Sequence, residues 1–171
     1  YTGKEILIAS NGNVGGTNDV VVIDVTNKTS PKFISKITYP HARYTHQGWF
    51  TEDQSHFILG DELDEQRVGT NTKSVVFDLT DLDAPKLSST YLGPTAAIDH
   101  NGYVKGNEFF IANYTAGLRV LDISNISAST TSMVETGYFD TYPENNSTSF
   151  KGVWSVYPYF ASGNIILNDI N

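Results

Sequence analysis

The chain of 171 residues carries 11 basic and 19 acidic residues, which gives a net charge of −8, and it contains no cysteine. The acidic balance argues against a nucleic-acid partner, and the missing thiols exclude disulfides, thiolate catalysis and zinc–thiolate sites. No apolar run approaches the roughly 20 residues that span a bilayer, so we expect no transmembrane segment in this chain.

A short phrase recurs along the chain and indicates its architecture. It reads VVIDVTN at 21–27, VVFDLTD at 75–81 and RVLDISN at 119–125, and a fourth copy, LNDIN, occupies 167–171. The aspartates of successive copies are 54, 44 and 47 residues apart. Periods of roughly 40 to 50 residues with strand-like content are typical of propeller blades.

The expected strands follow this period in chain order. An incomplete first unit supplies a second, third and fourth strand at 5–10, 20–25 and 32–38. Two complete units follow, with strands at 44–50, 56–60, 73–79 and 86–92, then at 99–104, 108–113, 118–123 and 133–139. The last unit begins at 153–156, continues at 164–167 and reaches its third strand in the final copy of the phrase.

These strands predict an all-β fold, a β-propeller of four-stranded antiparallel blades with only part of the ring in this chain. The prediction is a single domain over 1–171, divided into a partial blade 1–40, blades 44–92 and 98–140, and a partial blade 150–171. Closed propellers need roughly four to eight blades. We therefore expect this chain to pack against further blades of the same protein.

The phrase itself favours structure over chemistry. An Asp followed two residues later by Thr or Ser can accept hydrogen bonds from nearby backbone N–H groups and set a turn. We interpret Asp24, Asp78 and Asp122 in this way rather than as ligands.

A second recurrence lies in the first strand of the complete units. THQGWF at 45–50 and DHNGYV at 99–104 share the pattern His-x-Gly-aromatic. First strands line the central channel of a propeller, so His46 and His100, with Asp99 near, could hold a divalent metal or a polar ligand. We predict His46, His100, Asp99 and Trp49 as ligand-binding residues. The alternative is that each His bonds a backbone group and fixes the packing between blades.

An acidic loop, GDELDE at 60–65, directly follows an apolar strand. Its carboxylates could supply oxygens to Ca²⁺, which takes six to eight such ligands, although the spacing matches no EF-hand. Asp61 and Glu62 lie nearest the strand end and are the better metal ligands, ahead of Asp64 and Glu65. The alternative is a solvated acidic loop.

Catalytic templates are missing from the sequence: there is no Gly-x-Ser-x-Gly elbow, no His-Glu-x-x-His and no phosphate-binding loop. The favoured function is therefore a binding or adhesion module that recognises an extracellular protein or glycan. The alternative is an extracellular hydrolase whose site at the channel mouth uses His46, His100, Asp61 and Glu62.

Several longer motifs resemble the choice-of-anchor B family, whose members are exported proteins built on LVIVD-type repeats. The resemblance runs over essentially the whole chain and rests on HQGW at 46–49, GDELDE at 60–65, GP at 93–94, DHN at 99–101 and GYFDTYP at 137–143. It implies a β-propeller, export, attachment to the cell surface by varied C-terminal anchors, and more chain on both sides of this sequence. The family has no well-established activity, so the resemblance assigns no catalytic residue.

Overall fold

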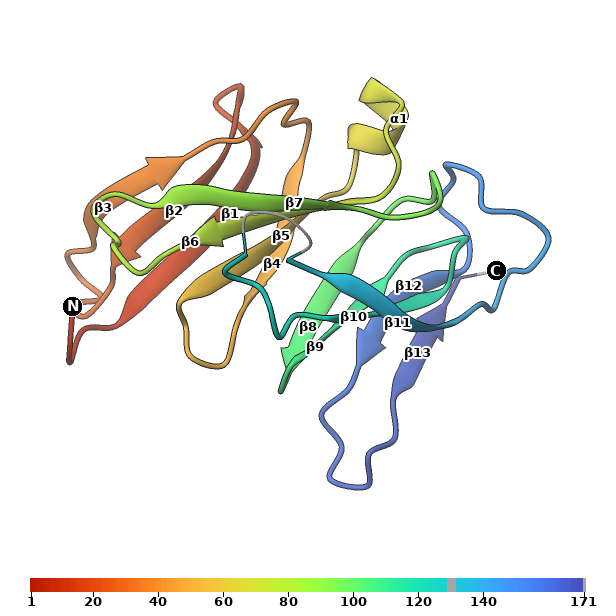
Figure 1. Ribbon diagram of the computed structural model, residues 1–171. Coiled ribbons are helices and arrows are strands. Elements are labelled where there is room, and N and C mark those ends of the chain that lie inside the picture. Colours follow the sequence, from red (N-terminus) through yellow and green to blue (C-terminus); the bar gives the residue numbers. More distant parts are fainter. Residues whose placement is uncertain (129–131, 171) are drawn as a thin grey trace.

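In the computed structural model, which describes residues 1–128 and 132–170, the strands form four antiparallel sheets (Figure 1). The first sheet contains β1 (Ile6–Val14), β2 (Thr17–Asp24) and β3 (Lys32–Ile37). The second contains β4 (Thr45–Phe50), β5 (His56–Asp61), β6 (Lys73–Asp78) and β7 (Lys86–Leu92). The third contains β8 (Asn101–Lys105), β9 (Glu108–Ala112), β10 (Leu118–Asp122) and β11 (Val134–Phe139), and the fourth contains β12 (Val153–Tyr157) and β13 (Ile166–Asp169).

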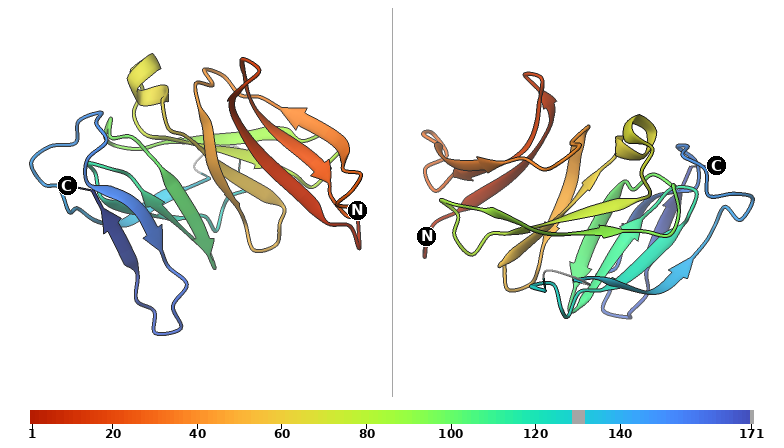
Figure 2. Two further views of the ribbon diagram at one scale, coloured as in Figure 1. Left: turned by 180° about the vertical axis from the view of Figure 1, so that it is seen from behind. Right: turned by 45° about the horizontal axis from the view of Figure 1, so that its top comes forward.

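The sheets follow one another in chain order, so that the two ends of the chain lie at opposite ends of the row (Figure 2). In the two four-stranded sheets each strand pairs with the next one in sequence. The first strands lie side by side, because β4 contacts β8 and β8 contacts β12. This is the arrangement of neighbouring propeller blades, and it confirms the predicted all-β propeller with part of a ring.

Apolar side chains on both faces of the inner strands hold the sheets together. All six residues of β5 are buried, and its side chains alternate between two clusters. Ile58 packs in the cluster shared with the third sheet, whereas Phe57 and Leu59 pack in the cluster shared with the first. Alternation of this kind follows from the two-residue period of a strand. It explains why β5 reads as a continuous apolar run instead of an alternating one.

A repeated irregularity marks the outer strand of three sheets. The register shifts between Val22 and Ile23, between Val76 and Phe77, and between Val120 and Leu121 of the third strands. Each shift lies at the same place in the recurring phrase, and each leaves one extra residue on the fourth strand. Such bulges increase the local twist of a sheet. The phrase therefore encodes a bulge as well as a strand.

The aspartates of the phrase close the turns that follow these strands. The Oδ1 atoms of Asp24, Asp78 and Asp122 accept hydrogen bonds from the backbone N–H two residues later, at 2.9, 2.9 and 2.8 Å. These contacts confirm their interpretation as turn-forming residues.

The fourth copy of the phrase does not occupy a third strand. β13 pairs directly with β12 and is therefore the second strand of its sheet. Asp169 lies opposite Val153, as Asp61 of β5 lies opposite Thr45. The prediction was wrong because the short phrase resembles the end of β5 as closely as it resembles the third strands; Asn171 lies outside the described residues.

One short helix, α1 (Asp64–Val68), was not expected from the sequence. It forms within the acidic loop, with Asp64 and Glu65 in its first turn and a left-handed Gly69 at its end. Acidic residues suit the positive end of the helix dipole, and glycine suits the left-handed cap. Among the described residues, no helix has the length and apolar character that crossing a membrane requires.

Candidate functional site

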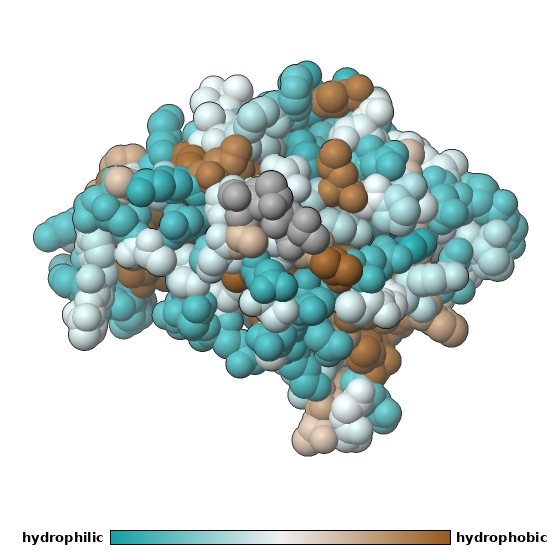
Figure 3. Space-filling view, in the orientation of Figure 1, coloured by the Kyte–Doolittle hydropathy of each residue, from teal (hydrophilic) through white to brown (hydrophobic). Residues whose placement is uncertain are grey.

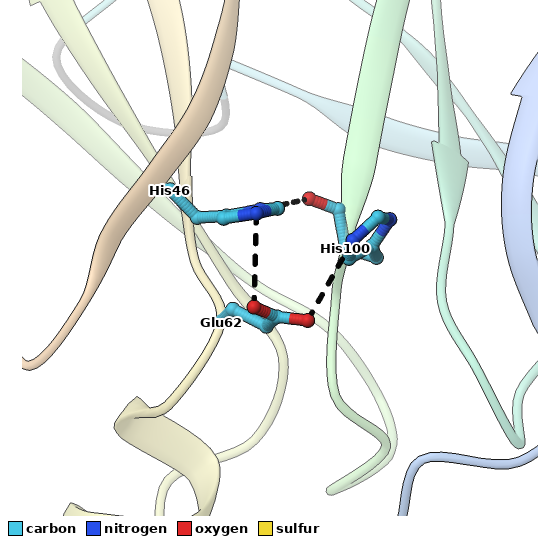
Figure 4. Close-up of side chains that lie close together, drawn as sticks. All are labelled: His46, Glu62 and His100. Carbon is cyan, nitrogen blue, oxygen red and sulfur yellow. Dashed lines mark hydrogen bonds and ion pairs between the residues drawn. The ribbon is translucent and has the colours of Figure 1, made fainter. Parts of the chain in front are cut away.

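Two histidines and one glutamate converge where the second sheet meets the third (Figure 4). His46 lies on β4, His100 directly precedes β8, and Glu62 follows β5. Nε2 of His46 lies 3.7 Å from Oε2 of Glu62, and Nε2 of His100 lies 3.7 Å from Oε1 of the same carboxylate. The side chains of His46, Glu62 and His100 are 27%, 14% and 11% exposed. We call these three residues the His–Glu–His cluster.

The opposite nitrogen of each ring is fixed by a backbone carbonyl. Nδ1 of His46 donates to the backbone oxygen of His100 at 3.0 Å, and Nδ1 of His100 donates to that of Trp154 at 2.6 Å. A carbonyl oxygen can only accept, so each Nδ1 carries the hydrogen, and Nε2 of the neutral ring presents a lone pair toward Glu62. The two hypotheses for the histidines, a ligand-binding role and a bond to the backbone, are thus compatible. Nδ1 of each ring joins two sheets through a backbone carbonyl, and Nε2 faces Glu62.

Aromatic residues surround the cluster and hold its members in place. The hydroxyl of Tyr114 donates to Oε1 of Glu62 at 3.0 Å, and the ring of Tyr44 stacks on His46 with centroids 5.6 Å apart. The ring of Trp154 lies 5.2 Å from that of His100. Burial lowers the pKa of His100, and the charge of Glu62 opposes this only in part. The imidazole of His100 is therefore kept neutral near pH 7, the form that binds metals.

The geometry of the His–Glu–His cluster fits a transition-metal ion. The candidate ligand atoms all lie within 4.8 Å of one another. Zn²⁺ binds His nitrogen at about 2.0–2.1 Å in a tetrahedron, which places ligand atoms about 3.4 Å apart. The two N–O distances of 3.7 Å are close to this value. Donation of the other ring nitrogen to a carbonyl is also the usual support for a metal-binding His.

Asp99 does not join this cluster, although it precedes His100 in the sequence. Its carboxylate lies with those of Asp64 and Glu65 in a second cluster, which is fully buried. The sequence analysis predicts Asp61 and Glu62 as better metal ligands than Asp64 and Glu65, which lie farther from the strand end. In the structure, helix α1 turns both of them inward.

Asp61 lies outside both clusters. Its Oδ1 accepts from the backbone N–H groups of Tyr44 and Leu63, at 2.8 and 3.3 Å, and its Oδ2 accepts from the backbone N–H of Arg43 and the hydroxyl of Tyr39, at 2.6 and 2.7 Å. The carboxylate thus anchors the segment that enters β4. Of the predicted pair of metal ligands, Glu62 alone belongs to a candidate metal cluster.

Trp49 lies three residues after His46 on β4, and its ring packs among other aromatic rings. Its ring meets that of Tyr103 edge-on at 4.8 Å, and that of Tyr159 lies 6.2 Å away. Gly48, which precedes it, has no room for a side chain because the ring of Phe57 occupies that space. Each position of the His-x-Gly-aromatic pattern therefore has a structural role. The His bonds the next sheet, the Gly leaves space for a phenylalanine ring, and the aromatic residue packs on another ring.

Sequence reasoning did not place Tyr114 or Trp154 beside the histidines. The repeat could have revealed Trp154, because it follows His100 by 54 residues, as His100 follows His46. For Tyr114 no sequence signal exists, since its ring reaches Glu62 from the loop after β9 across the boundary between two sheets.

The comparisons with known proteins agree with this architecture. A family model described as the LVIVD repeat matches residues 14–38 and 103–141, which include two copies of the phrase. No curated protein matches the sequence.

Three solved structures are similar to this chain in fold. The periplasmic gluconolactonase PpgL of Pseudomonas aeruginosa is 12% identical with a TM-score of 0.69, and the match covers 96% of this chain and 47% of that one. A protein from Lactobacillus plantarum is 12% identical with a TM-score of 0.65, covering 96% and 54%. The β-propeller domain of Cps50 (Swd1) from Myceliophteria thermophila is 15% identical with a TM-score of 0.50, covering 80% and 39%.

At these identities the likeness shows the fold alone. The chain spans about half the length of the first two of these structures. It is therefore a β-propeller chain that carries LVIVD repeats.

Proposed function

We propose that the protein is an exported β-propeller binding module, of the choice-of-anchor B type, whose functional site is a divalent metal centre at the His–Glu–His cluster. One observation carries this proposal: both Nε2 atoms face one carboxylate while both Nδ1 atoms are bound to backbone carbonyls. A zinc-class ion bound there would join two neighbouring blades.

Three protein ligands leave a position on a tetrahedral ion for another group. His46 is the most exposed member of the cluster, so this position is best reached from its side. A carboxylate of an extracellular protein or an acidic sugar of a glycan has suitable oxygen atoms. Recognition of such a ligand through the ion is the proposed mode of binding, and the periplasmic location named for PpgL accords with export.

Isothermal titration of the chelator-treated chain with Zn²⁺ tests the metal centre directly. We expect one high-affinity site per chain that His100→Asn abolishes and His41→Asn retains. His41 is the matched control because it is exposed and lies outside the cluster, and its positive φ of 60° suits asparagine. The proposal fails if the unaltered chain binds no Zn²⁺, or if His100→Asn binds it as tightly.

The second candidate function is metal-dependent hydrolysis of an extracellular polymer. The observation that favours it is the ligand set itself, because two His and one Glu with an open position form the set of several zinc hydrolases. Polysaccharide, ester and phosphoester substrates should be tested on the zinc-loaded chain. Activity that survives both His46→Asn and His100→Asn would exclude this site as its source.

The fourth sheet indicates how the chain would associate. Apolar side chains of β12, β13 and their connecting loop are exposed: Trp154, Tyr157, Phe160, Ile165 and Ile166. Figure 3 shows apolar surface in this region of the molecule. We propose that a further β-sheet blade of the same protein covers it, because each pair of neighbouring sheets in this chain already packs through a cluster of apolar residues.

A further inference from the structure

A second group of titratable side chains lies at the same boundary between sheets, and the proposed function does not use it. Asp64 and Glu65 in the first turn of α1 and Asp99 before β8 each bring a carboxylate oxygen within 4.8 Å of the other two. These residues are 0%, 3% and 3% exposed. Water therefore does not solvate them, and burying three carboxyl groups is costly unless something else compensates.

The surrounding protein supplies only part of that compensation. Lys73 forms an ion pair with Oδ2 of Asp64. In the described part of the chain, Oδ1 of Asp64, both oxygens of Glu65 and Oδ1 of Asp99 accept no hydrogen bond. Burial, followed by the charge of Asp99, raises the pKa of Glu65, and burial raises that of Asp99 as well. The ion pair with Lys73 thus compensates one of the three carboxyl groups directly.

The placement of Asp99 depends on a glycine. Gly60 of β5 has no side chain, and the space where its Cβ would lie is taken by Oδ2 of Asp99. Asp99 can therefore approach the second sheet closely enough to meet Asp64 and Glu65. The three carboxyl groups therefore connect α1 of the second sheet to the segment before β8 of the third sheet.

We propose that Asp64, Glu65 and Asp99 bind a Ca²⁺ ion. The candidate ligands are all oxygens, which hard cations prefer over the nitrogen and sulfur ligands that suit Zn²⁺. Ca²⁺ accepts bidentate carboxylates in flexible geometry, whereas Mg²⁺ demands a near-ideal octahedron and usually keeps several waters. Because Glu62 lies two residues before Asp64 and His100 directly follows Asp99, the ion would also fix the two segments that carry the His–Glu–His cluster.

Thermal unfolding of the whole chain with Ca²⁺ and with a chelator tests this site. At a Ca²⁺ concentration about a hundredfold above Kd, we expect Tm to rise by about 5 °C or more. Asp99→Asn and Glu65→Gln should each lose this rise, and calorimetric titration should show weaker Ca²⁺ binding in both. Glu65→Gln is the milder change and keeps the test valid if Asp99→Asn does not fold.

Two control variants separate this proposal from the others. Glu144→Gln removes an exposed carboxylate and should keep the full response to Ca²⁺. His46→Asn should keep it too, because His46 belongs to the other cluster. If the unaltered chain shows no rise in Tm with Ca²⁺, the proposal is overturned. Asp64, Glu65 and Asp99 would then be held together by shared protons and not by a metal ion. A rise that persists in both acidic variants also overturns the proposal, because the ion then binds elsewhere.

Discussion

The Nδ1 atom of His46 donates to the backbone oxygen of His100 at 3.0 Å, so the ring that also faces Glu62 binds the first strand of one sheet to the segment that enters the first strand of the next (Figure 4). The two nitrogens of the His46 ring thus have different roles, and different substitutions can remove one role and keep the other. Asn places an N–H donor near the position of Nδ1, whereas Gln places polar atoms near that of Nε2.

His46→Asn is therefore expected to keep the bond between the sheets and lose the metal ligand. Zn²⁺ affinity should fall by more than about 100-fold. Removing a residue that only hydrogen-bonds a metal ligand typically costs less, about 10–100-fold. Tm should change little. His46→Ala, in contrast, should lose metal affinity and also about 1 kcal/mol of stability with the hydrogen bond. Equal stability of the Asn and Ala variants would contradict a structural role for Nδ1.

Asp61→Asn should destabilise the fold strongly. An amide retains one acceptor oxygen and directs an NH₂ group at N–H and O–H donors, so the four hydrogen bonds of Asp61 cannot all persist. We expect the free energy of unfolding to fall by at least about 3 kcal/mol in urea titrations. Tyr39→Phe, which removes the donor to Asp61 and the partner of the Thr45 hydroxyl, should cost about 2 kcal/mol. Glu5→Gln, at an exposed carboxylate, serves as the control.

Gly48→Ala tests the glycine of the first-strand motif. A methyl group at this position would meet the ring of Phe57 and the backbone oxygen of Ile58. Because the ring is buried, we expect a loss of about 1–3 kcal/mol through overpacking. Gly137→Ala on β11 is the matched control, since a Cβ atom there would have no neighbour within 4 Å. Similar losses in both variants would point to strand propensity in place of packing.

Asp78 should make stability depend on pH in the acid range. Hydrogen bonds from the side chain and backbone of Thr80 lower the pKa of Asp78 from its ordinary value of 3.8. The contribution of Asp78 to the free energy of unfolding is therefore complete above about pH 5. It is lost as the pH falls through the lowered pKa that Asp78 has in the folded state. We expect the difference in Tm between the unaltered chain and Asp78→Asn to shrink between about pH 5 and 3. A difference that stays constant over this range would argue against the turn bond.

Ile166→Lys tests the exposed face of the fourth sheet. Ile166 is 55% exposed on β13, and a charge there should oppose the packing of another sheet. Light scattering should show less self-association of the variant than of the unaltered chain at equal concentration. Glu108→Lys is a control for the added charge, because Glu108 is exposed on β9. Unchanged association of Ile166→Lys would remove this face from the interface.

The sequence alone determined the architecture. The recurring phrase predicted the third strands, the turn-forming aspartates and the propeller, because each copy carries its own apolar pattern and its own turn chemistry. The same local logic identified His46 and His100 as equivalent first-strand residues. It misplaced the fourth copy, because four residues ending in aspartate fit the second strand of a blade as well as the third.

Only the tertiary structure decided which residues share a site. Glu62 faces two histidines that lie 16 residues before it and 38 after it, whereas its neighbour Asp61 holds the backbone that enters β4. Asp64 and Glu65 are buried because α1 turns them toward Asp99. The local signals that favour this helix do not indicate which of its side chains face inward. Side chains of the loop after β5 take their direction from the packing of one sheet on the next. That packing joins segments about 50 residues apart. A periodic sequence pattern gives the number of such segments but not the direction in which their side chains point.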